Sequence, residues 1–131
     1  MAQIPERGRE ILEKRSIGNV ATLMSDGSPH VTPVWVDLDG DVILVNTLDA
    51  RLKARNVRRD PRVGISVPDP DNPTVALIVR GTAELTADGA TEHADKLAQK
   101  YLGEDVYPYH QAGDVRVLIR IRPERVFIYG A

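Results

Sequence analysis

The sequence predicts a mainly β protein, a small closed or nearly closed antiparallel barrel of six strands with three short helices. Short aliphatic runs recur along the chain between turn signals, which is typical of strands joined by tight turns. Residues 115–122 place valine or isoleucine at every second position, the period of a strand. Helical spacing of apolar residues is confined to three short segments. Because 131 residues suit one compact domain, we expect a single domain over 1–131.

The first part of the chain predicts a short helix followed by a three-stranded meander. Pro5 lies in the first turn of the expected helix 4–16, and Ile4, Ile11 and Leu12 fall on one of its sides. Asp-Gly pairs then separate three aliphatic runs, as hairpin turns do. We therefore expect strands at 20–24, 30–38 and 42–45.

A polar stretch after the third strand indicates the start of a second helix, expected over 50–59. Asp49 is a suitable N-cap, because a short carboxylate can accept the free backbone N–H groups of a first turn. Pro61 ends the helix, since proline disfavours the helical conformation of the residue before it. Two further strands are expected at 63–67 and 75–85, on either side of a proline-rich turn.

The last part of the chain predicts a third helix, a loop and the sixth strand. Alanine, leucine and tyrosine recur at helical spacing over 91–102, which favours an amphipathic helix with His93 on its exposed side. The loop 103–113 follows and precedes the alternating strand 115–122. We expect residues 126–129 to end the chain in extended form.

The expected strand 30–38 carries apolar residues on both of its faces. Val34 and Val36 share one face, while Val31 and Trp35 share the other. One face can fill the barrel, so the other needs a cover. A second copy of the chain is the simplest cover, and we predict a homodimer.

Composition excludes several classes of protein. The chain has no cysteine, which excludes disulfides, thiolate metal sites and a cysteine nucleophile. Its longest aliphatic run, residues 75–79, is far too short to span a bilayer. Charged residues near the start occupy the place of the apolar part of a signal peptide. We expect a cytoplasmic protein that does not bind membranes.

Positive charge is concentrated in residues 51–62. This segment holds six basic residues and one acid, although the whole chain has a net charge of −2. A basic island in an acidic chain indicates a local anion site. The segment has no aromatic residue for stacking on bases, so we do not expect nucleic-acid binding.

The residues around the second helix are suited to binding an anion. Asn46 and Thr47 supply amide and hydroxyl groups in the turn before the helix, and Arg51 and Lys53 stand near its start. Free N–H groups and the positive end of the helix dipole gather there. Arginine can also grip phosphate oxygens in a forked geometry, and lysine adds a point charge. The same pattern is compatible with a basic helix face that contacts only water.

Three segments resemble a known superfamily. They are GNVATL at 18–23, DGSPHVTPV at 26–34 and RLKARNVRRDPR at 51–62, of which the third is the most specific. They resemble the pyridoxamine-phosphate-oxidase-like split β-barrel superfamily. More narrowly, they are similar to its flavin/deazaflavin oxidoreductase branch B, whose members use coenzyme F420.

The resemblance implies a homodimer with a cofactor in a groove at each subunit interface. By that resemblance, Arg51 and Lys53 match the positions that hold the cofactor phosphate. The residues that it places around the rest of the cofactor lie before and within the second helix and on the second strand. They are Asn46 and Thr47 near the phosphate, Asn56 in support, Thr32, Pro33 and Val34 along the ring, and Trp35 close by.

The resemblance leaves two cofactors open, because flavin mononucleotide (FMN) and coenzyme F420 both carry a phosphate on a ribityl chain. F420 adds a tail with several carboxylates. Arg55, Arg58 and Arg59 continue a basic stripe from Arg51, which favours F420. The alternative is that these arginines pair with acidic residues on the protein surface.

The function expected from the resemblance is hydride transfer between F420 and a small conjugated organic substrate. Tyr107, Tyr109 and His110 are clustered groups that could supply a proton, although such residues also pack structurally. The three histidines of the chain are widely spaced and predict no metal site. The alternatives are an FMN-binding oxidoreductase and a non-catalytic carrier of F420, flavin or haem.

Overall fold

Seven strands form one antiparallel sheet in the computed structural model, which describes residues 1–130. Three helices interrupt the strands. The elements follow one another as α1 (Glu6–Glu13), β1 (Ile17–Leu23), β2 (Pro29–Trp35), β3 (Asp37–Asp39), β4 (Val42–Leu48), α2 (Leu52–Arg59), β5 (Arg62–Asp69), β6 (Asn72–Thr86), α3 (Ala90–Leu102) and β7 (Arg116–Tyr129).

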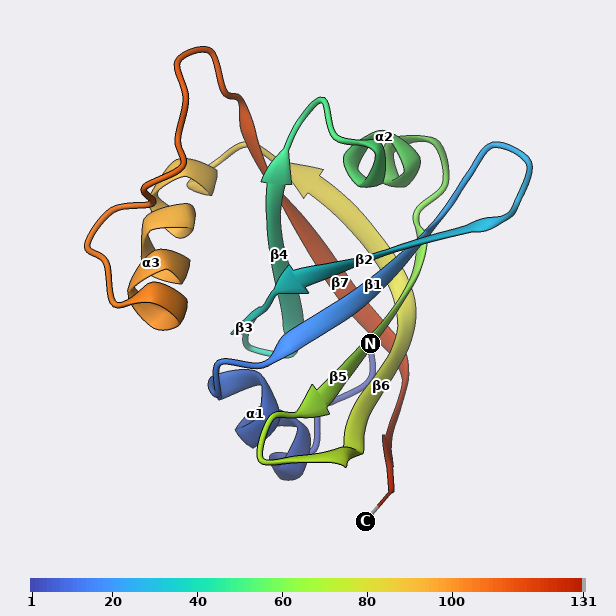
Figure 1. Cartoon of the computed structure of the whole chain (residues 1–131). Helices are drawn as coiled ribbons and strands as arrows, with labels where there is room; N and C mark the ends of the chain where they lie inside the picture. Colours follow the sequence, from blue (N-terminus) through green and yellow to red (C-terminus); the bar gives the residue numbers. More distant parts are fainter. Residues whose placement is uncertain (131) are drawn as a thin grey trace.

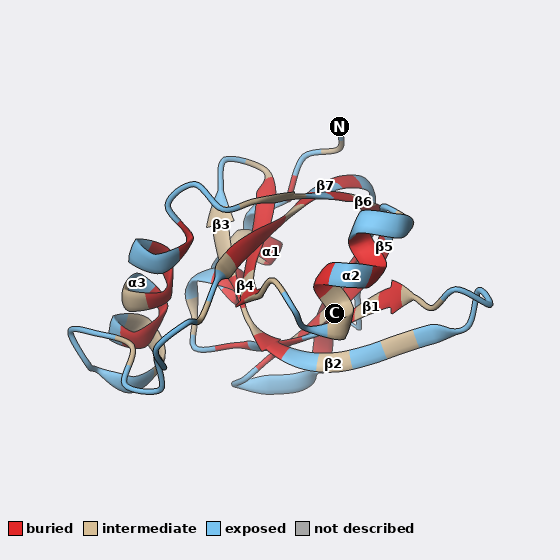
Figure 2. Cartoon of the chain, turned by 90° about the horizontal axis from the view of Figure 1, so that it is seen from above, coloured by how far each residue is buried: buried red, intermediate tan, exposed pale blue. Residues whose placement is uncertain are grey.

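The order of the strands forces the sheet to curl. That order is β2-β1-β5-β6-β7-β4-β3, so the two edge strands are β2 and β3. These strands are consecutive in the chain and are joined by Val36 alone. The two edges of the sheet therefore have to meet, and the sheet bends into the half-barrel of Figure 1. Its buried residues face the interior, as the view from above shows (Figure 2).

The predicted fold class is confirmed, and the predicted number of strands is wrong. The structure has seven strands because the expected strand 30–38 breaks at Val36 into β2 and β3. The expected strand 115–122 and the extended residues 126–129 are parts of the one long strand β7. The chain turns at Val36 to pass from one edge of the sheet to the other, a change of direction that local alternation does not reveal.

Side chains of α3 satisfy the backbone of Val36 at this corner. Val36 is fully buried, and its N–H donates to the Tyr101 hydroxyl at 2.9 Å. Its carbonyl accepts from Lys100 Nζ at 2.8 Å. Tyr101 in turn donates to the carbonyl of Ser16 at 2.6 Å. Burial raises the pKa of Tyr101 to about 12, so the hydroxyl keeps its proton at neutral pH.

The three expected helices are present, but α1 is shorter than the expected 4–16 and α2 begins at Leu52 instead of residue 50. The N-cap of this helix is Arg51, with no side-chain cap, so the prediction of Asp49 as N-cap is wrong. The Asp49 carboxylate is instead paired with Arg58. An ion pair with the last turn of α2 takes the place of the local cap. In residues 1–130 no helix is both long enough and apolar enough to cross a membrane.

Salt bridges attach α1 to the end of the β5–β6 hairpin. Arg7 and Lys14, one from each end of the helix, both pair with the buried carboxylate of Asp69. Ile11 and Leu12 from the same helix are buried in the core cluster. The hydrogen bond from Arg7 and those from Lys14 and the Asp71 N–H hold the pKa of Asp69 well below its usual range.

The outer face of β2 is open to solvent. Val31 is 58% exposed, whereas Val34 on the opposite face is buried. The division of the strand into a core face and an outer apolar face is as expected. The homodimer inferred from that outer face remains a prediction.

We expect Tyr101→Phe to lower the free energy of unfolding by about 1–3 kcal/mol, because the substitution leaves the buried N–H of Val36 and carbonyl of Ser16 without their partner. Tyr129→Phe is the matched control, since Tyr129 is 65% exposed and is expected to change little. Urea denaturation at one fixed protein concentration measures both. Equal stability of the two variants would contradict the role given to the hydroxyl.

Candidate functional site

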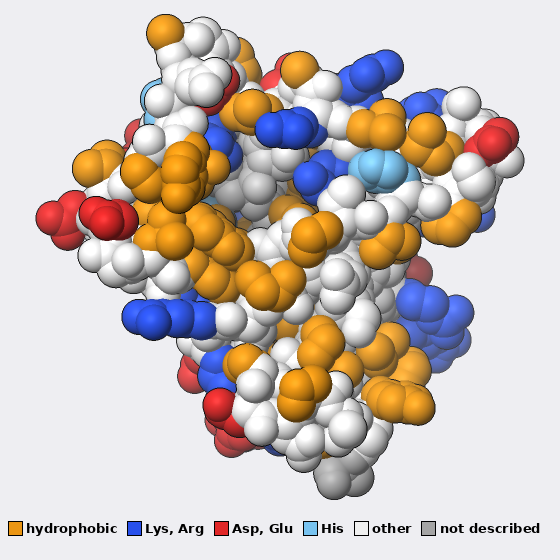
Figure 3. Space-filling view, in the orientation of Figure 1, with side chains coloured by type: hydrophobic (Ala, Val, Ile, Leu, Met, Phe, Trp, Pro, Cys, Tyr) orange, Lys and Arg blue, Asp and Glu red, His pale blue; other side chains and the backbone are white. Residues whose placement is uncertain are grey.

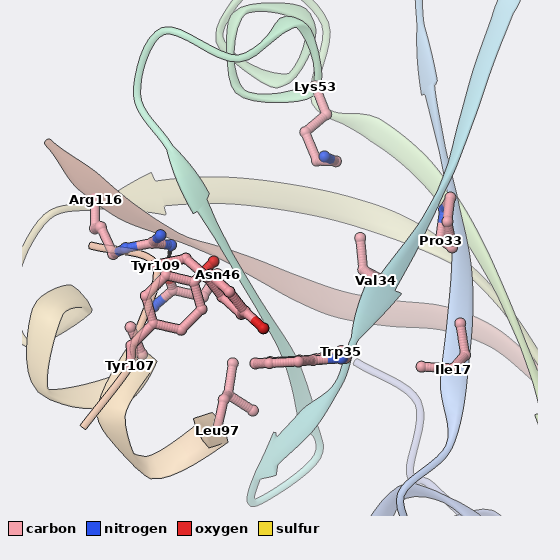
Figure 4. A pocket seen from close by; sticks show the side chains of 11 residues that line it. Ile17, Pro33, Val34, Trp35, Asn46, Lys53, Leu97, Tyr107, Tyr109 and Arg116 are labelled. Atoms are coloured by element: carbon pink, nitrogen blue, oxygen red, sulfur yellow. Dashed lines mark hydrogen bonds between the residues drawn. The ribbon is translucent and has the colours of Figure 1, made fainter. Parts of the chain in front are cut away.

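A pocket of about 550 Å³ lies between the open side of the barrel and α3. In the space-filling view, hydrophobic and cationic side chains meet around a hollow between α2 and α3 (Figure 3). The residues that line it come from six strands and helices and from the loop before β7. They are Ile17, Pro33, Val34, Trp35, Asn46, Lys53, Ala94, Leu97, Tyr107, Tyr109 and Arg116 (Figure 4).

Lys53 supplies positive charge at one end of the pocket. It is the second residue of α2, and its side chain extends from the helix toward the cavity (Figure 4). Burial lowers its pKa, and the neighbouring charge of Arg51 lowers it further. Within residues 1–130 no carboxylate forms an ion pair with Lys53. A half-buried, unpaired cation beside a second cation is a favourable place for an anion.

Aromatic rings form the wall below and beside this cation. Trp35 stacks on Tyr101, with ring centroids 4.9 Å apart and planes 3° apart. Tyr107 forms T-shaped contacts with Trp35 and with Tyr109, with ring centroids 6.2 Å and 5.5 Å apart, respectively. Because the Tyr101 hydroxyl is anchored to the corner at Val36, the plane of Trp35 is set by the closure of the barrel. The wall offers flat apolar surface to a planar ligand.

Arg116 supplies a second cation on the side opposite the strand β2 (Figure 4). Its Nη1 donates to Asn46 Oδ1 at 2.9 Å. Its guanidinium carbon lies 4.4 Å from the centre of the Tyr107 ring, in cation–π contact. The Nε atom is buried without a hydrogen-bond partner among residues 1–130. The guanidinium is thus fixed in place, but only some of its N–H groups donate hydrogen bonds.

A chain of hydrogen bonds orients Asn46 toward Arg116. His93 Nε2 lies 2.9 Å from Asp37 Oδ2, so the ring donates to the carboxylate and leaves Nδ1 as an acceptor. Asn46 Nδ2 then donates to His93 Nδ1 at 3.2 Å and to the carbonyl of Ala90 at 2.7 Å. These partners assign the amide orientation and direct Oδ1 toward Arg116.

The expectation that His93 is exposed is wrong, because only 8% of its surface is accessible. Asp37, its partner, lies in β3 and is far from His93 in the sequence. Burial alone would raise the pKa of Asp37. Hydrogen bonds from His93, the Leu38 N–H and Lys96 outweigh burial and hold that pKa well below its usual range. The carboxylate therefore stays charged and keeps His93 oriented.

The structure brings together seven of the residues predicted for the site. Asn46, Lys53, Pro33, Val34, Trp35, Tyr107 and Tyr109 all line the pocket. The predicted cofactor and proton-donor residues that do not line it are Arg51, Thr47, Asn56, Thr32, Arg55 and His110.

These six residues take different positions around the site. Arg51 is exposed at the N-terminus of α2, close enough to lower the pKa of Lys53. Asn56 is fully buried and donates to the hydroxyl of Thr22 at 3.0 Å. Thr47 is buried within β4, and the hydroxyl oxygen of Thr32 is buried without a partner among residues 1–130. His110 is exposed in the loop before β7.

The basic stripe of α2 is only partly free. Arg58 is paired with Asp49, and Arg59 donates to the carbonyl of Leu23 and to Asn56 Oδ1. Arg55 is exposed and forms no ion pair with a carboxylate of residues 1–130. Arg51 and Arg55 are therefore the pair of this stripe that remains available to a ligand.

Four lining residues were not predicted: Ile17, Ala94, Leu97 and Arg116. Ala94 and Leu97 carry the apolar signal of an amphipathic helix, which does not distinguish a core from a pocket. The alternation of residues 115–122 does place Arg116 on the face opposite the core valines. The sequence contains no sign that this face meets the loop with Tyr107.

The fold and the pocket define a class of small split-barrel proteins, in which a curled antiparallel sheet holds a cationic, aromatic-lined cavity. The model of one protein family, pyridoxamine 5'-phosphate oxidase, matches residues 4–130. The chain belongs to this family. Its members bind flavin-type cofactors.

Solved structures support the same assignment. An F420 reductase is 35% identical to this chain, with a TM-score of 0.81, and the match covers 95% of this chain and 98% of the other. A putative pyridoxamine 5'-phosphate oxidase from Listeria innocua is 25% identical, with a TM-score of 0.69 and coverage of 91% and 92%. A haem-binding protein from Mycobacterium smegmatis shares the fold at 21% identity and a TM-score of 0.71, covering 99% of this chain and 56% of that one.

We expect the pKa of Lys53 to lie below the ordinary lysine value and to rise in Arg51→Gln, because that substitution removes a neighbouring positive charge. Proton NMR titration of protein labelled with carbon-13 at the lysine ε-carbon measures this pKa, and Lys53→Arg assigns the signal. Arg55→Gln is the matched control and is expected to leave the pKa unchanged. If Arg51→Gln also leaves it unchanged, the two cations do not share a site.

Proposed function

We propose that the protein is an F420-dependent oxidoreductase that transfers a hydride between the deazaflavin and a small conjugated organic substrate. The observation that carries the proposal is the pocket itself, which joins an unpaired, half-buried lysine to a wall of aromatic rings. A flat ring system on a phosphate-bearing chain needs both features. The 35% identity to an F420 reductase over nearly the whole of both chains favours F420 over other ring cofactors.

The residues present fit such a cofactor. Lys53 and Arg51 provide two positive charges for a phosphate at the start of α2, where free N–H groups also gather. Pro33 and Val34 offer the surface and backbone that a flat ring requires, and Trp35 lies beside them. Thr32, which the resemblance places along the ring, does not line the pocket, although its buried hydroxyl lacks a partner among residues 1–130.

The free arginines of α2 favour the deazaflavin over FMN. Arg51 and Arg55 are exposed one helical turn apart, and within residues 1–130 neither forms an ion pair with a carboxylate. FMN ends in its phosphate, whereas F420 continues into a tail of carboxylates that these arginines could bind. FMN remains the second candidate, because the family binds flavin-type cofactors.

A bound cofactor of this kind supplies or accepts the hydride. The chain supplies orientation, electrostatics and a proton. The rigid wall around Trp35 holds a planar substrate against the cofactor, and the half-buried position of Lys53 limits competition from water. Tyr107 and Tyr109 present hydroxyl groups to the pocket, so a phenol Oη is the proposed proton donor. His110 is exposed and does not line the pocket.

We also propose that the working form is a homodimer with a cofactor at each interface. Val31 on β2 and Ile17 on β1 support it, because both are exposed apolar residues on paired strands and Ile17 also lines the pocket. A second copy packed on this surface would cover it and would narrow the open side of the pocket.

Fluorescence titration of the purified protein with F420, and separately with FMN, tests the proposed cofactor. We expect tight binding of F420 and weaker binding of FMN. Preference for FMN would move the protein to a flavin-dependent function. Binding of neither ligand would contradict both and leave a carrier of another group as the alternative.

We expect Lys53→Ala to weaken F420 binding by about 1.5–3 kcal/mol, or roughly 10- to 150-fold, because the ammonium group makes a charge-assisted contact with the phosphate. Arg122→Ala is the matched control, since it removes an exposed cation of β7 that does not line the pocket. The same titration measures both variants. Unchanged affinity in Lys53→Ala would remove this lysine from the phosphate site.

A further inference from the structure

Arg116 is the cation of the pocket that the proposed cofactor contacts do not use. It is the first residue of β7, and Figure 4 shows it beside Tyr107, Tyr109 and Asn46, across the cavity from Pro33 and Val34. Lys53 reaches into the cavity separately, from α2. The two cations thus enter the pocket from different elements and mark two separate places where negative charge is favoured.

The charge of Arg116 is not balanced by an acidic residue within 1–130. None of the residues that line the pocket is acidic. No carboxylate of residues 1–130 forms an ion pair with Arg116, and the hydrogen bond to Asn46 uses one of the five N–H donors of the guanidinium. The buried Nε has no partner among the same residues. A partly desolvated guanidinium with unused donors is stabilised by a ligand that accepts two hydrogen bonds.

The guanidinium is also held in one orientation before any ligand arrives. Asn46 fixes one edge, and the ring of Tyr107 supports its face at 4.4 Å. Asn46 is itself fixed by His93, and His93 by Asp37. Because this orientation does not have to be established on binding, more of the interaction with a ligand appears as affinity.

The surface between Arg116 and Trp35 selects the body of the ligand. Trp35, Leu97 and Tyr107 form an apolar floor and wall beside the cation. A forked donor beside flat apolar surface matches a carboxylate joined to a planar, conjugated group. A neutral ligand of the same shape would fill the space but leave the charge of Arg116 unpaired.

We propose that Arg116 binds the carboxylate of the substrate, and that the substrates are small, planar, conjugated carboxylic acids. This inference rests on the proposed function, because it assumes that the protein acts on a substrate. It deepens that function by naming the chemical class of the substrate. The residues of the subsite are Arg116 as the anion ligand, Asn46 and Tyr107 as its supports, and Trp35 and Leu97 as the apolar surface.

Trp35 allows a direct binding test, because it is the single tryptophan of the chain and lies in the pocket. The probes are trans-cinnamate and its neutral amide, trans-cinnamamide, which have nearly the same shape. We expect the fluorescence of the wild-type protein at pH 7 to report at least tenfold tighter binding of the acid. Equal binding of the two probes, or binding of neither, would overturn the proposal.

Variants test which cation of the pocket causes the tighter binding of the acid. We expect Arg116→Gln to abolish the preference for the acid, and Arg116→Lys to retain part of it, because a lysine keeps the charge without the fork. Arg120→Gln is the matched control on the same strand and is expected to keep the full preference. If Arg116→Gln does not fold, an undiminished preference in Arg116→Lys overturns the proposal. Loss of the preference in Lys53→Gln, with Arg116→Gln unchanged, also overturns it.

F420 titration of Arg116→Gln separates this inference from the proposed function. We expect its F420 affinity to stay within about threefold of wild type. A large loss of F420 affinity would place Arg116 in the cofactor site and overturn the inference. If the wild-type protein does not bind F420 but keeps a preference for the acid that depends on Arg116, the proposed function fails and the carboxylate site stands.

Discussion

The structure depends on one constraint, the joining of both edges of the sheet at Val36. A seven-stranded sheet whose edge strands follow each other in the chain cannot stay flat. The corner leaves the backbone of a buried residue without the usual ladder partners, and an unpaired buried amide is costly. Tyr101 and Lys100 supply those partners, which attaches α3 to the barrel. The same tyrosine stacks on Trp35, so closing the barrel also builds one wall of the pocket.

The pocket combines apolar surface with cations that form no ion pair with a carboxylate of residues 1–130. Burial and the neighbouring Arg51 lower the pKa of Lys53, and Arg116 keeps most of its donors free. At structural contacts elsewhere charges are paired, as Asp69 is with Arg7 and Lys14. The contrast between paired charges at the structural contacts and unpaired charges around one cavity is what indicates a ligand site with an anionic occupant.

The residues named for the candidate site differ in how well the sequence predicted their positions. Lys53, Asn46 and Trp35 were named from a strand–turn–helix pattern and a resemblance, because helix starts and turns leave a signal within a few residues. Asn56 was named with them, yet it lies in the core and donates to Thr22. Lys53 and Asn56 are three residues apart and lie near one another on the helix surface. Which of them meets the pocket and which meets the core depends on packing that the pattern does not contain.

The sequence by itself determined the antiparallel β class, the places of the turns, the helix that carries Lys53, and the apolar character of both faces of β2. These features follow from periodicity and turn chemistry, which act between near neighbours. Only the tertiary structure decided the break at Val36, the burial of His93 against Asp37, and the meeting of Arg116 with Tyr107 and Asn46. Each of these depends on groups from different elements that come together only when the sheet curls, so no local pattern records them.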